Sequence, residues 1–148
     1  RLPRCRRLRH SMTMPGATLS ARDLIARLIA FDTTSRESNL ALIDFVRDYL
    51  DGWGIASELY FDADRRKADL YAPHGTTASG RVQLSGHTDT VPVDGQAWDS
   101  VPGKVTQCDD KLYARGTSDM ESLIAIALHG VNLSGLQSNP SIFPMAWF

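Results

Sequence analysis

Helix-like and strand-like segments alternate along this chain, and this alternation constrains the fold more than any other feature of the sequence. The first helical pattern begins at Ser20, which forms a capping-box-like start with Asp23. A second pattern runs from about Asn39 to Leu50, and Gly52 and Gly54 favour its end because glycine accepts left-handed geometry. Such segments, interleaved with strands, predict an α/β domain in which helices cover a sheet.

Short strand-like segments account for most of the rest: residues 55–60, 68–72, 81–84, 104–107 and 111–114. The last two flank Asp109 and Asp110, which are typical of a hairpin turn. A largely apolar helix is expected over about 119–129. The uncharged stretch that follows, ending in residues 141–147, is typical of a buried central strand, so we expect a chain that is cut within its domain.

Charge is unevenly distributed between a short basic head and an acidic body. Residues 1–13 carry five arginines and no acid, which leaves 11 basic and 17 acidic side chains, a net charge of −6, for residues 14–148. An acidic body disfavours nucleic acid as a partner. A basic arm, a transit segment, an inert tail or translation from upstream of the true start remain open for residues 1–13. We expect them to form a basic tail outside the fold, with residues 14–148 as the domain.

Two further observations exclude other classes of protein. No apolar run approaches the roughly 18–20 residues that span a bilayer, so we expect no membrane partner. Cys5 and Cys108 are too few for a disulfide framework, and their spacing matches no metal knuckle. We interpret both as reduced thiols of a cytoplasmic protein.

The densest cluster of chemically active residues follows the strand expected over residues 81–84. It contains His87 and Asp89, two positions apart and able to face the same side. The carboxyl ends of strands are where sites form in open α/β sheets, and a histidine held by a carboxylate is a common metal arrangement. A turn that carries a surface histidine and aspartate is the alternative.

A second cluster lies at the junction between the last hairpin and the apolar helix. Its Asp119 could cap that helix, because an aspartate there accepts backbone N–H groups and suits the positive helix end. It could instead be a carboxylate ligand aimed into the same cleft as His87. Imidazole and carboxylate together suit zinc or cobalt.

Together the two clusters resemble the M20 zinc metallopeptidase and deacylase superfamily. The shared order is a strand, S-G-H-T-D-T-V-P at 85–92, a segment with Trp98 and a hairpin, and R-G-T-S-D-M at 115–120. The similarity spans roughly residues 19–128. The pieces F-D-T-T-S and T-D-T-V-P-V-D-G-Q favour the branch that removes the acetyl group from N-acetylornithine in arginine biosynthesis.

The resemblance implies a metal-dependent amidohydrolase whose complete site holds two ions, Zn²⁺ or Co²⁺. In that site His87 ligates one ion and Asp119 bridges both, while Asp89 serves catalysis by orienting His87. A metal-bound water, deprotonated by a glutamate, attacks the acyl carbonyl and releases acetate and ornithine. The implied partner is a small N-acyl amino acid.

The resemblance also implies a fold and shows departures from the family pattern. The chain corresponds to the incomplete N-terminal part of a phosphorylase/hydrolase-like metallopeptidase domain, a three-layer mixed sheet flanked by helices. The later ligands, the paired acids and the lid and dimerisation domain are not in it, so a homodimer is expected only for the full-length member. Glu121 and Ser122 stand where the family has Lys-Gly, and residues 99–103 lack an aromatic. His74 and His129 match no ligand position.

These departures make us expect that the chain as written is inactive, since two ligands are fewer than the three or four of a stable zinc site. A desuccinylase, aminoacylase or peptidase of the same superfamily is a near alternative, with the same metal chemistry. A non-catalytic truncated product is an alternative of a different class. A nucleic-acid binder would need basic residues within the body, where acids outnumber them.

Overall fold

The computed structural model of the chain describes residues 5–8, 19–73, 83–133 and 144–147. Within them helices and strands are mixed as the sequence pattern predicts, although they do not strictly alternate, because two helices and then five strands follow one another. The elements in chain order are β1 (Cys5–Arg7), α1 (Ala21–Ile29), α2 (Leu40–Asp51), β2 (Glu58–Phe61), β3 (Ala68–Tyr71), β4 (Leu84–His87), β5 (Thr106–Cys108), β6 (Lys111–Tyr113), α3 (Glu121–Leu133) and β7 (Pro144–Trp147).

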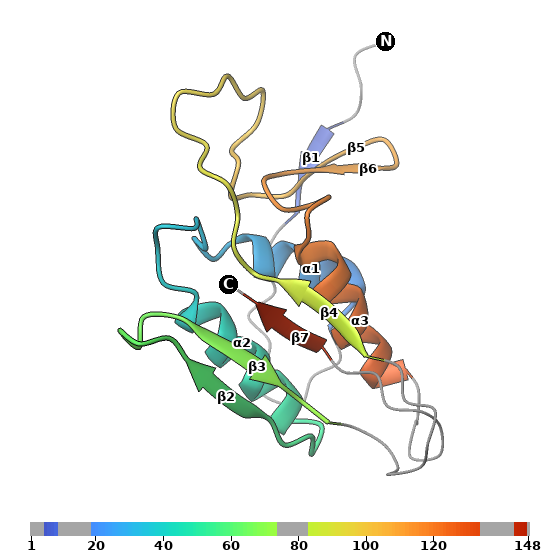
Figure 1. Cartoon of the computed structure of the whole chain (residues 1–148). Helices are drawn as coiled ribbons and strands as arrows, with labels where there is room; N and C mark the ends of the chain where they lie inside the picture. Colours follow the sequence, from blue (N-terminus) through green and yellow to red (C-terminus); the bar gives the residue numbers. More distant parts are fainter. Residues whose placement is uncertain (1–4, 9–18, 74–82, 134–143, 148) are drawn as a thin grey trace.

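The main sheet has the strand order β2-β3-β7-β4. β3 pairs antiparallel with both β2 and β7, whereas β7 pairs parallel with β4, so the sheet is mixed. Helix α2 packs against β3, α3 against β4, and α1 against α3 (Figure 1). The predicted α/β fold is therefore confirmed. The expectation of a central strand over residues 141–147 also holds for β7, which lies between two neighbours.

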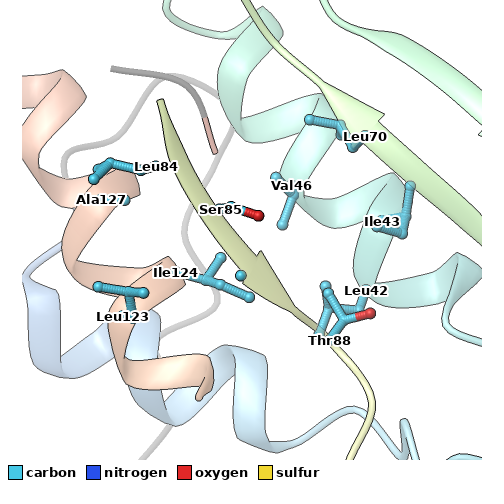
Figure 2. Close-up of a pocket in the computed structure, with 11 residues that line it drawn as sticks. Leu42, Ile43, Val46, Leu70, Leu84, Ser85, Thr88, Leu123, Ile124 and Ala127 are labelled. Carbon is cyan, nitrogen blue, oxygen red and sulfur yellow. The ribbon is translucent and has the colours of Figure 1, made fainter. Parts of the chain in front are cut away.

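The hydrophobic core lies where the helices meet this sheet. Its largest fully buried apolar side chains are Leu24, Leu28, Leu42, Ile43, Leu50, Leu70, Leu128 and Val105. A small pocket of about 20 Å³ lies between α2, β4 and α3, lined mainly by apolar side chains (Figure 2). Since β4 pairs with β7 and packs against α3, the residues that follow it are held at one defined edge of the sheet.

The helix ends confirm the predictions from the sequence, with one difference at Gly52. Ser20 caps α1 by accepting a hydrogen bond from the backbone N–H of Asp23 at 3.2 Å, as expected. Asn39 precedes α2, but its side chain makes no capping bond and instead reaches the neighbouring strand. After α2, Gly52 stays right-handed and Gly54, at φ +72°, takes the left-handed conformation.

The strand and helix boundaries differ from the predicted ones by a few residues. β4 lies three positions later than the pattern at residues 81–84 suggests, and residues 81–82 lie outside the described part of the chain. α3 begins at Glu121, two residues after Asp119. This shift matters because it leaves Asp119 in the preceding turn, where its carboxylate is not needed as a helix cap. The predicted hairpin of β5 and β6 around Asp109 and Asp110 is confirmed.

A small second sheet, in the order β1-β5-β6, corrects two expectations about the N-terminus. Cys5–Arg7, expected to lie in a tail outside the fold, pairs antiparallel with β5 as strand β1. Cys5 lies opposite Cys108, and the two form a disulfide rather than remaining reduced thiols. Pairing across an antiparallel ladder brings the two Cα atoms to 4.1 Å despite a separation of 103 residues. No helix in the described part of the chain has the length and apolarity to cross a membrane.

Candidate metal centre

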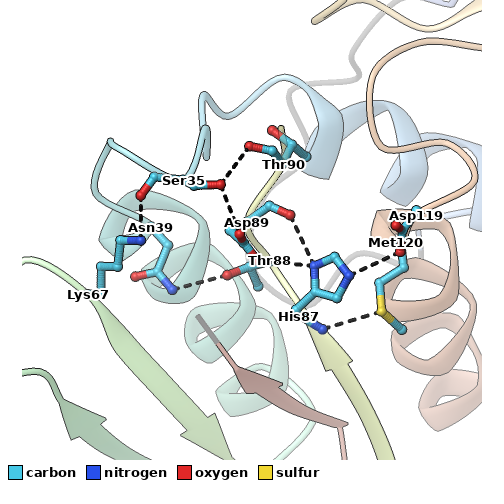
Figure 3. A network of polar contacts seen from close by, with 9 residues as sticks. All are labelled: Ser35, Asn39, Lys67, His87, Thr88, Asp89, Thr90, Asp119 and Met120. Carbon is cyan, nitrogen blue, oxygen red and sulfur yellow. Dashed lines mark hydrogen bonds and ion pairs between the residues drawn. The ribbon is translucent and has the colours of Figure 1, made fainter. Parts of the chain in front are cut away.

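The two clusters singled out in the sequence meet at one edge of the main sheet. His87 is the last residue of β4, and Asp119 lies in the turn before α3. Nε2 of His87 lies 3.0 Å from Oδ1 of Asp119 (Figure 3). The side chain of Asp119 is 81% exposed, so this pair faces the solvent rather than the core. The arrangement favours the ligand interpretation of Asp119 over the helix cap.

Asp89 lies on the other side of the His87 ring. Nδ1 of His87 is 3.0 Å from the backbone carbonyl oxygen of Asp89 and 3.2 Å from its carboxylate Oδ1. Both of these atoms only accept hydrogen bonds, so a hydrogen on Nδ1 has acceptors in place. In the neutral tautomer that carries its hydrogen on Nδ1, the Nε2 lone pair points towards Asp119. This is the tautomer that a metal ligand coordinating through Nε2 requires.

His87 faces oxygen acceptors on both ring nitrogens, and its pKa reflects this. Burial alone lowers the pKa, but the hydrogen bonds to Asp119 and to the Asp89 backbone, with the charges of both carboxylates, raise it above 6.5. In a neutral ring that carries its hydrogen on Nδ1, the Nε2 lone pair would meet a carboxylate oxygen at close range. Either a proton or a cation between the two atoms removes this repulsion.

Two neighbours shape the backbone around His87. The Sδ atom of Met120 accepts a hydrogen bond from the backbone N–H of His87 at 3.4 Å. The methyl group of Met120 also lies where a side chain on Gly86 would begin, 3.0 Å from an ideal Cβ. The glycine of the S-G-H motif therefore lets the turn before α3 pack closely on β4. This contact holds Asp119 in reach of His87.

Glu121 stands two residues after Asp119 and is 1% exposed. Burial, the largest influence, raises its pKa to about 7, and the charge of His87 partly opposes that rise. Its Oε2 has no hydrogen-bond partner among the residues that the structure describes, and it lies against Gly116, at φ +90°, where a Cβ would collide with the carboxylate. The sequence marked Glu121 only as a departure from the family pattern, and its burial was not foreseen.

The residues that could hold a metal ion are His87 and Asp119. Within the described ranges no group of three or more histidine, cysteine, aspartate or glutamate side chains is arranged to bind one. His129 hydrogen-bonds through Nδ1 to the carbonyl oxygen of Leu19, as a helix-end histidine rather than a ligand. His74 lies outside the described residues.

A cleft of about 360 Å³ is lined by Thr90 and Glu121, which follow His87 by three residues and Asp119 by two, although His87 and Asp119 themselves do not line it. Thr34, Arg36 and Arg115 also contribute to its walls. Volumes of this order hold small molecules in proteins. No pattern in the sequence indicates this cleft, because its lining residues are far apart in the chain.

Comparison with known protein families adds an independent observation. Residues 83–139 match the model described as peptidase family M20/M25/M40. This segment contains both His87 and Asp119. It therefore covers the two clusters that the structure brings together.

Comparison with curated proteins and solved structures extends the likeness. The chain is 39% identical over 113 residues to an acetylornithine deacetylase of Myxococcus xanthus, a match that covers 73% of this chain and 29% of that protein. It is 36% identical to an acetylornithine deacetylase of Proteus mirabilis, covering 78% and 31%. The chain thus spans about 30% of the length of the curated relatives it matches.

Two solved structures share the fold. Human carnosine dipeptidase 1 superimposes with a TM-score of 0.73 at 19% identity, covering 85% of this chain and 31% of that one. An M20 family metallo-carboxypeptidase, Sso-CP2 from Sulfolobus solfataricus, gives a TM-score of 0.72 at 18% identity, covering 85% and 30%. At these identities the likeness shows the fold alone.

Proposed function

The chain is homologous to peptidases of the M20/M25/M40 family, and from this we propose that it supplies part of the site of a metal-dependent amidohydrolase. His87 and Asp119 are the proposed ligands of a divalent cation, and Asp89 is the proposed orienting residue of His87. The observation that carries the proposal is the 3.0 Å separation of Nε2 of His87 from Oδ1 of Asp119.

The donor atoms fit such an ion. Nitrogen and oxygen ligands that lie about 2.0–2.2 Å from zinc at angles of roughly 90–110° are about 2.8–3.5 Å apart. The observed separation of 3.0 Å falls within that interval, so both atoms can reach one cation with little movement. Two ligands make half of a zinc site, because stable sites use three or four protein ligands. We therefore expect weak binding by this chain alone.

A divalent cation bound here would activate a water and polarise an amide carbonyl, which is the chemistry that amide hydrolysis requires. The chain's own residues prepare for it. With its hydrogen on Nδ1, where the backbone carbonyl and the carboxylate of Asp89 can accept it, His87 would leave Nε2 free to coordinate. Asp119 would contribute a negative charge through an exposed carboxylate, and Glu121, two residues later, lines the cleft.

The proposed substrate class is a small N-acyl amino acid, and N-acetylornithine is the proposed member. This rests on the curated relatives, which are named as acetylornithine deacetylases, and on the size of the adjoining cleft. Arginine biosynthesis, a cytoplasmic location and zinc or cobalt as the ion follow from the same proposal.

The test is a chimera in which this chain replaces the matching segment of the Myxococcus xanthus acetylornithine deacetylase. Acetate release from N-acetylornithine is compared with release of succinate from an N-succinyl amino acid. We expect the chimera to release acetate, and its His87→Ala and Asp119→Ala variants to lose roughly 100-fold or more of that rate. A folded chimera whose rate survives both substitutions would contradict the assignment. The chain alone, with two ligands, is expected to release no acetate.

A further inference from the structure

We propose that Ser35 is a positioning residue for His87, acting through the carboxylate of Asp89. This inference rests on the proposed function, since it concerns the ligand that would hold the metal ion. Ser35 is 52 positions before His87 and belongs to the loop between α1 and α2. Figure 3 shows it on the side of Asp89 that faces away from the imidazole ring.

The carboxylate of Asp89 divides its two oxygens between two partners. Oγ of Ser35 donates a hydrogen bond to Oδ2 of Asp89 at 3.0 Å, while Oδ1 faces Nδ1 of His87 at 3.2 Å. A carboxylate held at one oxygen has a restricted rotation about its terminal torsion, which is otherwise broad. Ser35 therefore determines where Oδ1 lies relative to the imidazole.

Ser35 can hold the carboxylate because its own backbone is tied down. Its N–H donates to the carbonyl oxygen of Thr90 at 3.0 Å, and the N–H of Thr90 donates to Thr33 at 3.0 Å. Its carbonyl oxygen accepts a hydrogen bond from Nζ of Lys67 at 2.7 Å. The loop before α2, the turn after β4 and the turn before β3 thus converge on this one serine.

The hydrogen bond from Ser35 to Asp89 matters because the carboxylate of Asp89 is partly exposed to solvent. Its side chain is 33% exposed, so without Ser35 solvent would compete for the carboxylate and other rotations would be populated. The backbone carbonyl of Asp89 would still accept from Nδ1 of His87. The expected effect is therefore partial: orientation of the ring is loosened, not lost.

The hydroxyl also makes a 3.2 Å contact with the carbonyl oxygen of Thr90, so a loop-tying role is the competing explanation. The two roles predict a different dependence of the Ser35→Ala effect on the carboxylate of Asp89. A loop tie weakens the site whether or not Asp89 carries a carboxylate. A positioning role disappears when the carboxylate is removed, because nothing then connects Ser35 to the ring.

The experiment is a double-mutant cycle on Zn²⁺ affinity, measured by calorimetry on the whole chain. Ser35→Ala is expected to weaken binding by about 3- to 10-fold, less than the roughly 10- to 100-fold typical of direct partners of a metal ligand. Ser35→Thr should bind Zn²⁺ with the affinity of wild type, since it keeps the hydroxyl at an exposed position with room for a methyl group. In an Asp89→Ala background, Ser35→Ala should have no further effect. Ser38→Ala is the matched control, because Ser38 lies in the same loop and its hydroxyl accepts a hydrogen bond from the neighbouring N–H of Leu40.

A second readout needs no metal. Nitrogen chemical shifts of the His87 ring, recorded at about pH 8.5 on the metal-free chain, report which nitrogen carries the hydrogen. Wild type and Ser35→Thr should show Nδ1–H, and Ser35→Ala a mixture of tautomers. Unchanged shifts in folded Ser35→Ala, or an equal loss of affinity with and without Asp89, would overturn the proposal. If wild type fails to bind zinc, the metal assignment falls, and the ring shifts still decide the role of Ser35.

Discussion

Replacing Glu121 by glutamine should remove the pH dependence that this buried carboxyl imposes on folding. Glu121 is 1% exposed, and its Oε2 lies against Gly116 without a hydrogen-bond partner. The glutamine side chain has nearly the same shape but cannot ionise. The substitution therefore removes the titration while leaving the packing almost intact.

The magnitude follows from the pKa. Burial raises the pKa of Glu121 from an ordinary 4.5 to about 7. A rise of this size corresponds to about 3 kcal/mol of preference for the protonated form in the folded chain. The stabilisation is fully present below the unfolded pKa and is lost as the pH rises through the folded pKa. Between about pH 5 and pH 8, wild type should therefore lose about 2–3 kcal/mol of unfolding free energy that Glu121→Gln retains.

The assay is urea unfolding of the metal-free chain at several pH values between about 5 and 8. A buried amide adds a cost that does not change with pH, so the comparison uses the slope of stability with pH. His87 titrates in both proteins, so its contribution to the slope largely cancels in the comparison. Glu37→Gln is the control, because it removes the same charge from a side chain that is 48% exposed. If Glu121→Gln follows wild type across the whole range, the reasoning about the buried carboxyl is refuted.

Three further substitutions test other contacts. Gly116→Ala should destabilise the fold by about 2 kcal/mol or more, because φ is +90° and the new Cβ meets the carboxylate of Glu121. Part of this loss should return in the double variant with Glu121→Ala, and an unchanged urea midpoint in the single variant would contradict the contact. Asn39→Ala should cost about 2–4 kcal/mol, since it leaves the buried N–H and carbonyl of Ala68 without their side-chain partner. A loss below about 0.5 kcal/mol in urea unfolding would count against that bridge. Cys5→Ser should lower stability by about 2–4 kcal/mol under oxidising conditions and have little effect in reductant. Equal urea midpoints for wild type and Cys5→Ser without reductant would argue against the disulfide.

Local features of the fold could be predicted from the sequence because they depend on neighbours in the chain. The cap of Ser20 on the N–H of Asp23 and the turn at Asp109 each involve residues only a few positions apart. The contact between His87 and Asp119 was expected from the resemblance to a family, in which residues of these two clusters bind the same metal site. No local pattern indicated it alone.

Contacts between distant segments could not be predicted in this way. The sequence pattern indicates only that a helix starts near Asn39. In the structure, the side-chain amide of Asn39 forms hydrogen bonds with the backbone of Ala68 and with the hydroxyl of Thr88. The link from Ser35 to Asp89 depends on two loops that meet only after β4 is placed beside α2. The F-D-T-T-S motif carried the signal of a hydroxyl-rich loop, but not the identity of its partner.

The N-terminal segment shows the same limit. Five arginines suggested a solvated tail, whereas antiparallel pairing with β5 decides the conformation of Cys5–Arg7. Arg6 donates a hydrogen bond to Gln107 at 3.2 Å, so one of these cations is used in the sheet. Charge alone does not reveal a strand partner a hundred residues away.

We propose that His87 and Asp119 together hold a divalent cation. Calorimetric titration of Zn²⁺ into the metal-free chain, beside His87→Ala and Asp119→Ala, tests this proposal. We expect weak, saturable binding by wild type that both substitutions abolish, with the wild-type fold retained by circular dichroism. Binding that survives either substitution, or that wild type lacks altogether, would contradict the claim.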